Sequence, residues 1–160
     1  MSLRIGTGYD VHALERGLPL FIGGVKIKHS HGLVGHSDAD VLLHAISDAL
    51  LGALALGDLG KHFPDNSNEF KGIDSKVLLK KSYDLVKAKG FLLENLDSTV
   101  ILELPKLGPY IEDIRKTIAN VMGTDVENIS VKATTTEKLG FTGRKEGIAA
   151  EAVVLLKSRN

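Results

Sequence analysis

The sequence contains no cysteine and no tryptophan, and its 20 lysine and arginine residues are balanced by 20 aspartate and glutamate residues. Without cysteine, the chain cannot form disulfides, cysteine-ligated zinc or iron–sulfur sites, or a thiol nucleophile. A nucleic-acid-binding domain normally carries a basic surface, so the zero net charge argues against a nucleic-acid partner. No apolar run approaches the roughly 18 residues of a membrane helix, and the N-terminus lacks a secretory signal pattern. We therefore expect a cytoplasmic protein with neither a nucleic-acid nor a membrane partner.

What the sequence does contain is a hydrophobic share of 43% in 160 residues, which predicts a single domain over residues 1–160 with its own core. The histidines are unevenly placed, because all six lie in the first 62 residues: His12, His29, His31, His36, His44 and His62. From His36 to Asp65 there are also five aspartates against a single lysine. Imidazole and carboxylate groups concentrated in one segment suit a divalent cation.

The hydrophobic pattern predicts an α+β fold, a two-layer sandwich of a mixed β-sheet with helices on one face. Gly23-Gly24 reads as a tight turn, and Ser37 or Asp38 as the cap of the first helix. The segment 57–74 is longer than a plain connection needs, which favours a lid or a substrate loop. Strands are expected at 3–12, at 20–28 as two short strands, and at 96–103, 129–134 and 148–156, and helices at 41–56, 75–89 and 110–122.

Three side chains could form a metal site. Asp10 and His12 are two apart on a predicted strand, so they project to the same side. His44 lies on the first predicted helix, with Asp48 one turn further on as a candidate to orient it. Two imidazoles and a carboxylate with a fourth position open is the arrangement of a catalytic zinc. The alternative is that Asp10 and His12 are ordinary polar residues at a strand end and His44 is a hydrogen-bonded interior histidine.

Two further segments could bind phosphate. The run from His36 to Asp38 precedes a helix, whose free N–H groups and positive dipole end suit phosphate, although simple capping would explain it as well. The segment Lys132–Arg144 carries a run of three threonines, a fourth threonine, basic side chains and two glycines. Glu137 could ligate a hard divalent cation there and Thr135 could bind phosphate oxygens, whereas β propensity alone could also explain the threonine run.

Taken together, these motifs resemble the 2-C-methyl-D-erythritol 2,4-cyclodiphosphate synthase family of the non-mevalonate isoprenoid pathway. The resemblance extends from Ile5 to Leu156, and its most specific part is Lys132–Arg144. The matching segments are Asp10–His12, Ile22–Val25, His36–Val41, His44-Ala45, Ala55–Gly60, Phe63–Asp65, Lys132–Arg144 and Glu146–Ala149.

The resemblance implies a lyase that catalyses a metal-dependent intramolecular phosphoryl transfer. The 2-phosphate of 4-diphosphocytidyl-2-C-methyl-D-erythritol 2-phosphate attacks its own β-phosphorus, breaks a phosphorus–oxygen bond and releases CMP, giving the 2,4-cyclodiphosphate. The nucleophile is already an anionic oxygen, so this chemistry needs no nucleophilic residue and no strong general base. Positioning and charge neutralisation should dominate.

The resemblance also implies roles for individual residues. Asp10, His12 and His44 correspond to zinc ligands, and Glu137 to the ligand of a Mg²⁺ or Mn²⁺ ion that bridges the substrate phosphates. His36 and Thr135 correspond to catalytic positions that stabilise the transition state. Asp10, His12, His36, Thr135 and Glu137 are also expected to contact substrate. Further substrate-binding positions are Ser37, Asp58, Leu59, Gly60, Phe63, Pro64, Asp65 and Thr136. The cytidine pocket corresponds to Leu102, Pro105, Lys106, Leu107, Gly108, Ala133 and Thr134.

The family resemblance implies a homotrimer whose active sites lie between subunits, each joining the metal residues of one chain to the cytidine pocket of the next. A central cavity is expected to hold isoprenoid diphosphates, with Phe141 lining it and Arg144 near its mouth. Some relatives are fused to a cytidylyltransferase, and the length of 160 residues predicts the cyclase alone. Two other functions stay open: a zinc-dependent phosphohydrolase, and a trimeric isoprenoid-binding module without turnover.

Overall fold

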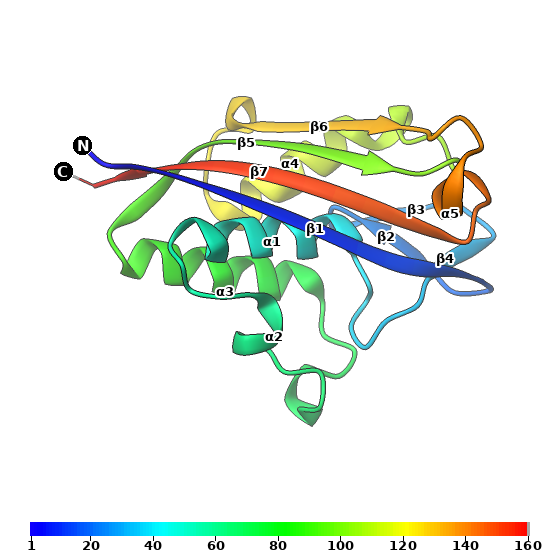
Figure 1. Cartoon of the computed structure of the whole chain (residues 1–160), viewed down its shortest axis with the longest axis horizontal. Helices are drawn as coiled ribbons and strands as arrows, with labels where there is room; N and C mark the ends of the chain where they lie inside the picture. Colours follow the sequence, from blue (N-terminus) through cyan, green and yellow to red (C-terminus); the bar gives the residue numbers. More distant parts are fainter. Residues whose placement is uncertain (160) are drawn as a thin grey trace.

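Five strands form one mixed sheet in the order β4-β1-β7-β5-β6, as the computed structural model of the chain shows for residues 1–159 (Figure 1). β5 and β6 are parallel, and the other neighbouring pairs are antiparallel. A separate two-stranded hairpin consists of β2 (Leu20–Ile22) and β3 (Val25–Ile27). The strands of the sheet are β1 (Leu3–Arg16), β4 (His31–Leu33), β5 (Phe91–Ile101), β6 (Ile129–Thr134) and β7 (Gly147–Ser158).

Three long helices pack on one face of this sheet: α1 (Val41–Ala53), α3 (Ser75–Ala88) and α4 (Ile111–Met122) (Figure 1). The shorter helices are α2 (Leu59–His62), α5 (Gly140–Gly143) and the 3-10 turns Asn68–Phe70, Gly108–Tyr110 and Val126–Asn128. The α+β class and the mixed sheet are confirmed. Within residues 1–159, no helix combines the length and apolar character that crossing a membrane requires.

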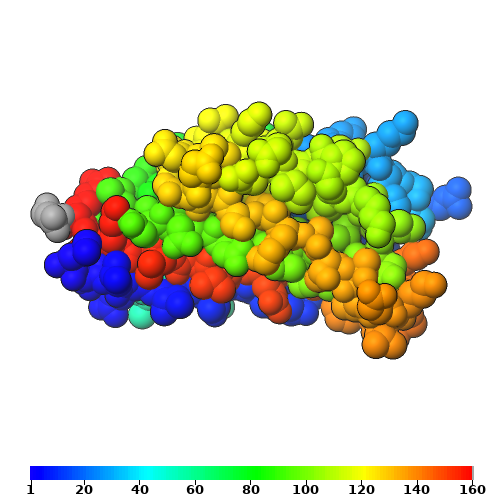
Figure 2. All heavy atoms as spheres, turned by 90° about the horizontal axis from the view of Figure 1, so that it is seen from above, coloured from blue at the N-terminus to red at the C-terminus, as the bar shows by residue number. Residues whose placement is uncertain are grey.

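In the part of the chain that the structure describes, helices cover one face of the sheet and leave the other uncovered. Along β7, Ala150, Ala152, Val154 and Leu156 alternate toward the helices and are buried, whereas Val153 on the other face is 43% exposed. In Figure 2 the side chains of β1, β7 and β5 lie at the surface as blue, red and green stripes, and α5 projects at one end in orange. The uncovered face therefore leaves apolar side chains at the surface.

Two glycines allow β1 to approach α1 unusually closely. A Cβ atom at Gly8 would lie 1.8 Å from the carbonyl oxygen of Ala45, and one at Gly6 would lie 2.0 Å from that of Ala49. Only glycine fits at such a backbone approach. The contact places the later part of β1 beside the first turns of α1, which is where the candidate site lies.

The element boundaries follow the sequence expectations closely in some places and not in others. β6 spans the predicted residues, and α4 ends at Met122 as predicted, capped by Gly123 with a left-handed φ of 66°. The predicted cap of α1 is wrong, because Asp40 is the N-cap and its side chain accepts from the amide of Leu43. α1 also ends earlier than predicted, at Ala53, and the predicted loops contain β4, α2 and α5.

Candidate active site

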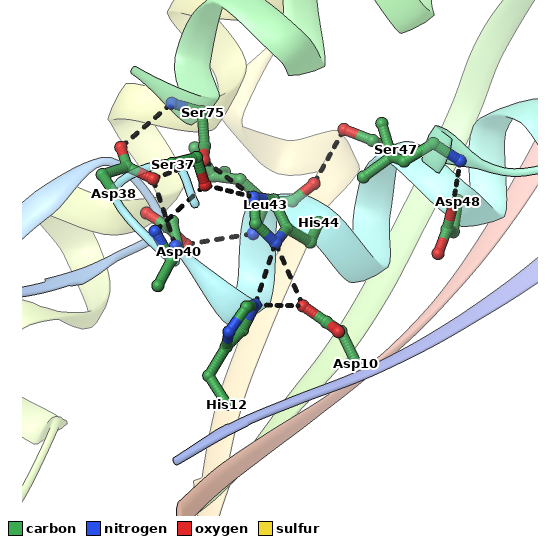
Figure 3. Close-up of polar contacts among 12 residues, drawn as sticks. Asp10, His12, Ser37, Asp38, Asp40, Leu43, His44, Ser47, Asp48 and Ser75 are labelled. Atoms are coloured by element: carbon green, nitrogen blue, oxygen red, sulfur yellow. Dashed lines mark hydrogen bonds and ion pairs between the residues drawn. The ribbon is translucent and has the colours of Figure 1, made fainter. Parts of the chain in front are cut away.

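Asp10 and His12 of β1 and His44 of α1 point at one another (Figure 3). The Oδ2 atom of Asp10 lies 3.0 Å from Nε2 of His12 and 3.1 Å from Nδ1 of His44. The two ring nitrogens are 3.2 Å apart. These three donor atoms therefore form a nearly equilateral triangle between the sheet and the helix, as the sequence predicted.

The triangle fits a zinc ion. Ligands about 2.0–2.1 Å from a tetrahedral zinc lie about 3.3 Å from one another, close to the separations found here. The ring of His12 is also in the form that a metal needs, because its Nδ1 lies 2.8 Å from the carbonyl oxygen of Val34. A carbonyl only accepts, so Nδ1 carries the proton and Nε2 keeps its lone pair for the ion. Among residues 1–159, these three form the one group of histidine and acidic side chains whose donor atoms lie close enough together to hold a metal ion.

The electrostatics of the cluster favour a bound cation. Burial alone would raise the pKa of Asp10, but the hydrogen bonds and positive charge of His12 and His44 lower it to about 2. Burial alone would lower the pKa of His12, but its hydrogen bond and ion pair with Asp10 raise it. A carboxylate that stays ionised down to low pH beside two imidazoles is a donor set for a divalent cation.

Asp48 does not orient His44, contrary to the sequence prediction. Its Oδ1 atom accepts a hydrogen bond of 2.8 Å from the backbone amide of Leu59, at the start of α2. Burial raises the pKa of the Asp48 carboxyl. The outer nitrogen of His44, Nε2, instead lies 2.9 Å from Oγ of Ser75 and 3.2 Å from Oγ of Ser37. The residues that orient His44 therefore come from α3 and from the segment before α1.

A cavity of about 330 Å³ opens beside the three ligands. It brings together most of the residues predicted to hold the methylerythritol phosphate. Asp58 and Pro64 are not among its lining residues, and the Asp58 side chain instead caps α2 by accepting from the amide of Lys61 at 3.0 Å. The lining residues are Asp10, His12, Gly35, His36, Ser37, His44, Leu59, Gly60, Phe63, Asp65, Phe70, Ile73 and Leu78.

The sequence analysis missed four of these lining residues. Gly35 has no side chain, and Phe70, Ile73 and Leu78 are apolar, so none carries a chemical signal that a sequence pattern could reveal. Phe70 packs edge-on against Phe63, with ring centroids 5.5 Å apart. For Phe70 and Ile73, the unusual length of the segment 57–74 was the available signal, and it indicated the region without naming the residues.

The start of α1 offers less to a phosphate than the sequence suggested. Asp40 is fully buried and accepts hydrogen bonds from the amides of Gly23, Gly24 and Leu43. Burial raises the pKa of Asp40 to about 6. Because this carboxylate uses the amide of Leu43, that N–H group is not free for phosphate. His36 is nevertheless exposed and lines the cavity.

A second cavity, of about 100 Å³, lies at the ends of β5 and β6. It contains most of the predicted cytidine pocket. Gly108, Thr136 and Glu137 do not line it, and Oγ1 of Thr136 instead donates to the carbonyl of Leu139 at 2.6 Å. Glu137 is exposed in a left-handed turn with a φ of 53°. The lining residues are Leu102, Glu103, Pro105, Lys106, Leu107, Ala133, Thr134 and Thr135.

A third, cationic cavity of about 510 Å³ contains Arg144 but not Phe141. The Nε atom of Arg144 lies 3.0 Å from Glu146, and Phe141 is 37% exposed. The lining residues are Glu103, Leu104, Lys106, Lys138, Gly143, Arg144 and Lys145.

The cavity beside the three metal ligands and the second cavity, which contains most of the predicted cytidine pocket, have no lining residue in common. Across the sheet, Asp10 pairs with Ala150, Ala150 with Val100, and Val100 with Ala133. Three strand spacings separate Asp10 from Ala133, which is about 14 Å. The buried Ala150 and Val100 lie between them. Within one chain, the two cavities are therefore divided by packed core.

Comparisons with known proteins agree with this geometry. A family model described as the YgbB family matches residues 3–157. A 2-C-methyl-D-erythritol 2,4-cyclodiphosphate synthase of Shewanella sediminis is 62% identical over 98% of this chain and 97% of that protein. The bifunctional IspDF of Campylobacter jejuni has a TM-score of 0.96 and 45% identity over 99% of this chain, which spans only 43% of that structure. The CDP complex of IspF from Plasmodium falciparum has a TM-score of 0.87 and 37% identity over 99% of this chain and 98% of that one.

Proposed function

The chain belongs to the YgbB family, and we propose that it converts 4-diphosphocytidyl-2-C-methyl-D-erythritol 2-phosphate into 2-C-methyl-D-erythritol 2,4-cyclodiphosphate with release of CMP. It acts as a single domain over residues 1–160 and as a phosphorus–oxygen lyase of isoprenoid precursor synthesis. The observation that carries the proposal is the triangle of Asp10, His12 and His44 opening into a cavity walled by the segment 57–74. The cytoplasmic location stays a prediction.

The reaction needs charge neutralisation and alignment more than proton transfer. A zinc ion held by Asp10, His12 and His44 would supply a Lewis acid for a phosphate oxygen. His36, exposed at the same cavity, supplies a donor to the charge that develops on the transferring phosphoryl group. The remaining wall binds the methylerythritol part: Ser37, Leu59, Gly60, Phe63 and Asp65 line the cavity, and Asp58 and Pro64 flank them in the chain.

The segment around Thr135 binds the diphosphate and the nucleoside. Thr135 lines the second cavity, and its hydroxyl accepts from the amide of Glu137 at 3.2 Å, which fixes the turn that exposes the Glu137 carboxylate. That carboxylate is the proposed protein ligand of a Mg²⁺ or Mn²⁺ ion on the substrate phosphates. The pocket formed by Leu102, Pro105, Lys106, Leu107, Ala133 and Thr134, with Gly108 and Thr136 adjoining it, takes the cytidine.

The separation of the two cavities supports a site completed by a second copy of the chain. A core about 14 Å across divides Asp10 from Ala133, so one substrate cannot bridge them through the same subunit. The uncovered sheet face offers an interface, since Ile5 is 70% and Tyr9 is 56% exposed there. These observations support an oligomer, and the family resemblance implies a homotrimer, whose mass measured by light scattering should be three times the 17.2 kDa of one chain.

The same assembly would bring three copies of the uncovered sheet face around one axis. The cationic cavity that contains Arg144 lies near this face, beside α5. Arg144 and its neighbouring lysines suit a diphosphate, and the exposed apolar side chains, Phe141 among them, suit an isoprenoid tail. An isoprenoid diphosphate is therefore the proposed ligand of the trimer cavity.

The test is product analysis with the purified chain and the cytidylylated substrate. CMP and the cyclic diphosphate are expected to form together, to be lost after chelation, and to return when Zn²⁺ and Mg²⁺ are restored. A linear methylerythritol phosphate in place of the cyclic product would instead identify a phosphohydrolase. Isoprenoid diphosphate binding without CMP release would identify a binding module.

A further inference from the structure

Ser75 contacts the outer edge of His44 although 31 residues separate them. It is the first residue of α3 and is fully buried. Its Oγ atom lies 2.9 Å from Nε2 of His44 and donates a short hydrogen bond to Oδ1 of Asp38. Its backbone amide donates to Oδ2 of the same carboxylate at 2.9 Å. Figure 3 shows these three side chains in sequence, leading away from Asp10 and His12.

The direction of each hydrogen bond in this chain is fixed by chemistry. An ionised carboxylate only accepts, so the hydroxyl proton of Ser75 points to Asp38. The Ser75 oxygen then presents a lone pair to His44, and Nε2 of His44 must be the donor. In a neutral imidazole the other nitrogen, Nδ1, is then unprotonated, and it is this atom that faces Asp10 and His12.

The geometry points to Asp38 and Ser75 as positioning residues that hold His44 in its metal-binding tautomer, with Nε2 protonated and Nδ1 free. This inference rests on the metal site of the proposed function. Without Ser75, the Asp10 carboxylate at 3.1 Å would be the strongest remaining acceptor next to His44 and would favour a proton on Nδ1. A metal ion would then have to displace that proton. Ser75, oriented by Asp38, therefore accepts the proton on the outer ring nitrogen of His44, as the carbonyl of Val34 accepts the proton on the outer ring nitrogen of His12.

The surrounding backbone holds Asp38 in place. Its Oδ1 atom accepts from the amide of Asp40 at 3.1 Å, and its own amide donates to the carbonyl of Ile73 at 3.3 Å. Ile73 lines the cavity and lies two residues before Ser75. The same contacts therefore connect the wall of the substrate cavity to the orientation of a metal ligand. Ser37, at 3.2 Å from Nε2, is a second and longer acceptor, so loss of Ser75 should weaken the arrangement without abolishing it.

Ser75→Ala tests the assignment through metal affinity and through the tautomer. We expect Zn²⁺, titrated against a chromogenic chelator, to bind about 10–100-fold more weakly than to the unsubstituted chain, the usual effect of removing such a supporting hydrogen bond. In the metal-free protein, ¹⁵N NMR of the His44 ring should report a proton on Nε2 in the unsubstituted chain. In Ser75→Ala the signal should shift toward a proton on Nδ1.

The matched control is Ser82→Ala, on the same helix. The Ser82 hydroxyl is buried and has no hydrogen-bond partner among residues 1–159, so its removal should change neither readout. If Ser75→Ala fails to fold, Asp38→Ala serves instead. It removes the carboxylate that accepts the hydroxyl proton of Ser75. That proton is then free to turn toward Nε2 of His44 and place the imidazole proton on Nδ1.

The inference is overturned if His44 carries its proton on Nδ1 in the unsubstituted chain, or if Ser75→Ala changes neither zinc affinity nor tautomer. It is supported if both change while Ser82→Ala matches the unsubstituted chain. Failure of the proposed metal site has a different signature, because the unsubstituted chain would then not bind Zn²⁺ at all. The tautomer measurement on the metal-free protein would still decide the roles of Ser75 and Asp38.

Discussion

The carboxylate of Asp40 accepts a hydrogen bond of 2.7 Å from the backbone amide of Gly24, which lies 16 residues earlier in the chain. The same carboxylate accepts from Gly23 at 2.9 Å and from Leu43 at 3.1 Å. One buried side chain thus joins the β2–β3 hairpin to the first turn of α1. His44 follows one turn later, with its amide bonded to the carbonyl of Asp40 at 3.0 Å. The hairpin, remote from the site in sequence, therefore helps to fix a metal ligand.

Asp40→Asn should destabilise the fold. One amide oxygen can accept from Gly23 and Leu43, but the amide nitrogen would then face the N–H group of Gly24 and leave it without an acceptor. A buried donor left unpaired costs about 1–3 kcal/mol, which urea unfolding at neutral pH would detect. Asp125→Asn is the control, because Asp125 is exposed and its side chain makes no capping hydrogen bond. Equal stability of the two variants would contradict the role of Asp40.

Gly8→Ala should separate β1 from α1. Its new Cβ would lie 1.8 Å from the carbonyl oxygen of Ala45, so the strand must move away, and forcing such a contact costs about 1–3 kcal/mol or more. Because Asp10 and His12 follow on the same strand, zinc affinity should fall as well. Gly52→Ala on α1 would meet no atom from outside its own helical turn closer than 3.8 Å and should leave stability unchanged or higher. Calorimetry and zinc titration of both variants check the contrast.

The sequence predicted those parts of the site that depend on local spacing. The alternation of β1 places Asp10 and His12 on one side, and a helical stretch of residues presents His44, so these ligands were accessible to pattern reasoning. The same applies to the end of α4, which Gly123 caps. These features depend on residues that are close in sequence.

Contacts between distant segments could not be predicted in the same way. Asp48 was assigned to His44 because a spacing of four residues makes helical neighbours, but the start of α2 takes that carboxylate through the amide of Leu59. Ser75 carries no motif, and its contact with His44 exists only because α3 begins against α1. A glycine can occur anywhere in a strand, so Gly8 did not reveal from the sequence that β1 approaches α1 closely at this position.

His44→Ala should remove zinc binding and turnover together. The substitution deletes one corner of the triangle, leaving Asp10 and His12 as two ligands where a catalytic zinc usually has three. Metal analysis of the purified variant and CMP release measured on the same sample test this. His29→Ala, outside the cavity and outside the metal cluster, is the control. Full activity in His44→Ala would refute the metal assignment.

Glu137→Ala should separate the two proposed metals. The side chain is exposed and is not part of the zinc triangle, so zinc content should stay unchanged. The activity should need more Mg²⁺ or Mn²⁺ to saturate, because the proposed protein ligand of that ion is lost. Glu127→Ala, another exposed glutamate, is the control. A Mg²⁺ titration of CMP release that is identical for both variants would exclude Glu137 as a ligand.

Asp48→Asn should change how stability depends on pH. Burial, together with the nearby negative charges of Asp10 and Asp58, raises the pKa of Asp48 above its ordinary value of 3.8. The folded state therefore holds this proton more tightly than the unfolded state, so the free energy of unfolding falls as pH rises from 3.8 through the raised pKa. An asparagine keeps the oxygen that accepts from Leu59 and has no charge to bury. The free energy of unfolding of the variant, minus that of the unsubstituted chain, should therefore increase as the pH rises from acidic to neutral. Urea unfolding of the zinc-free proteins would measure this, and parallel pH profiles would show that Asp48 titrates as an ordinary carboxyl.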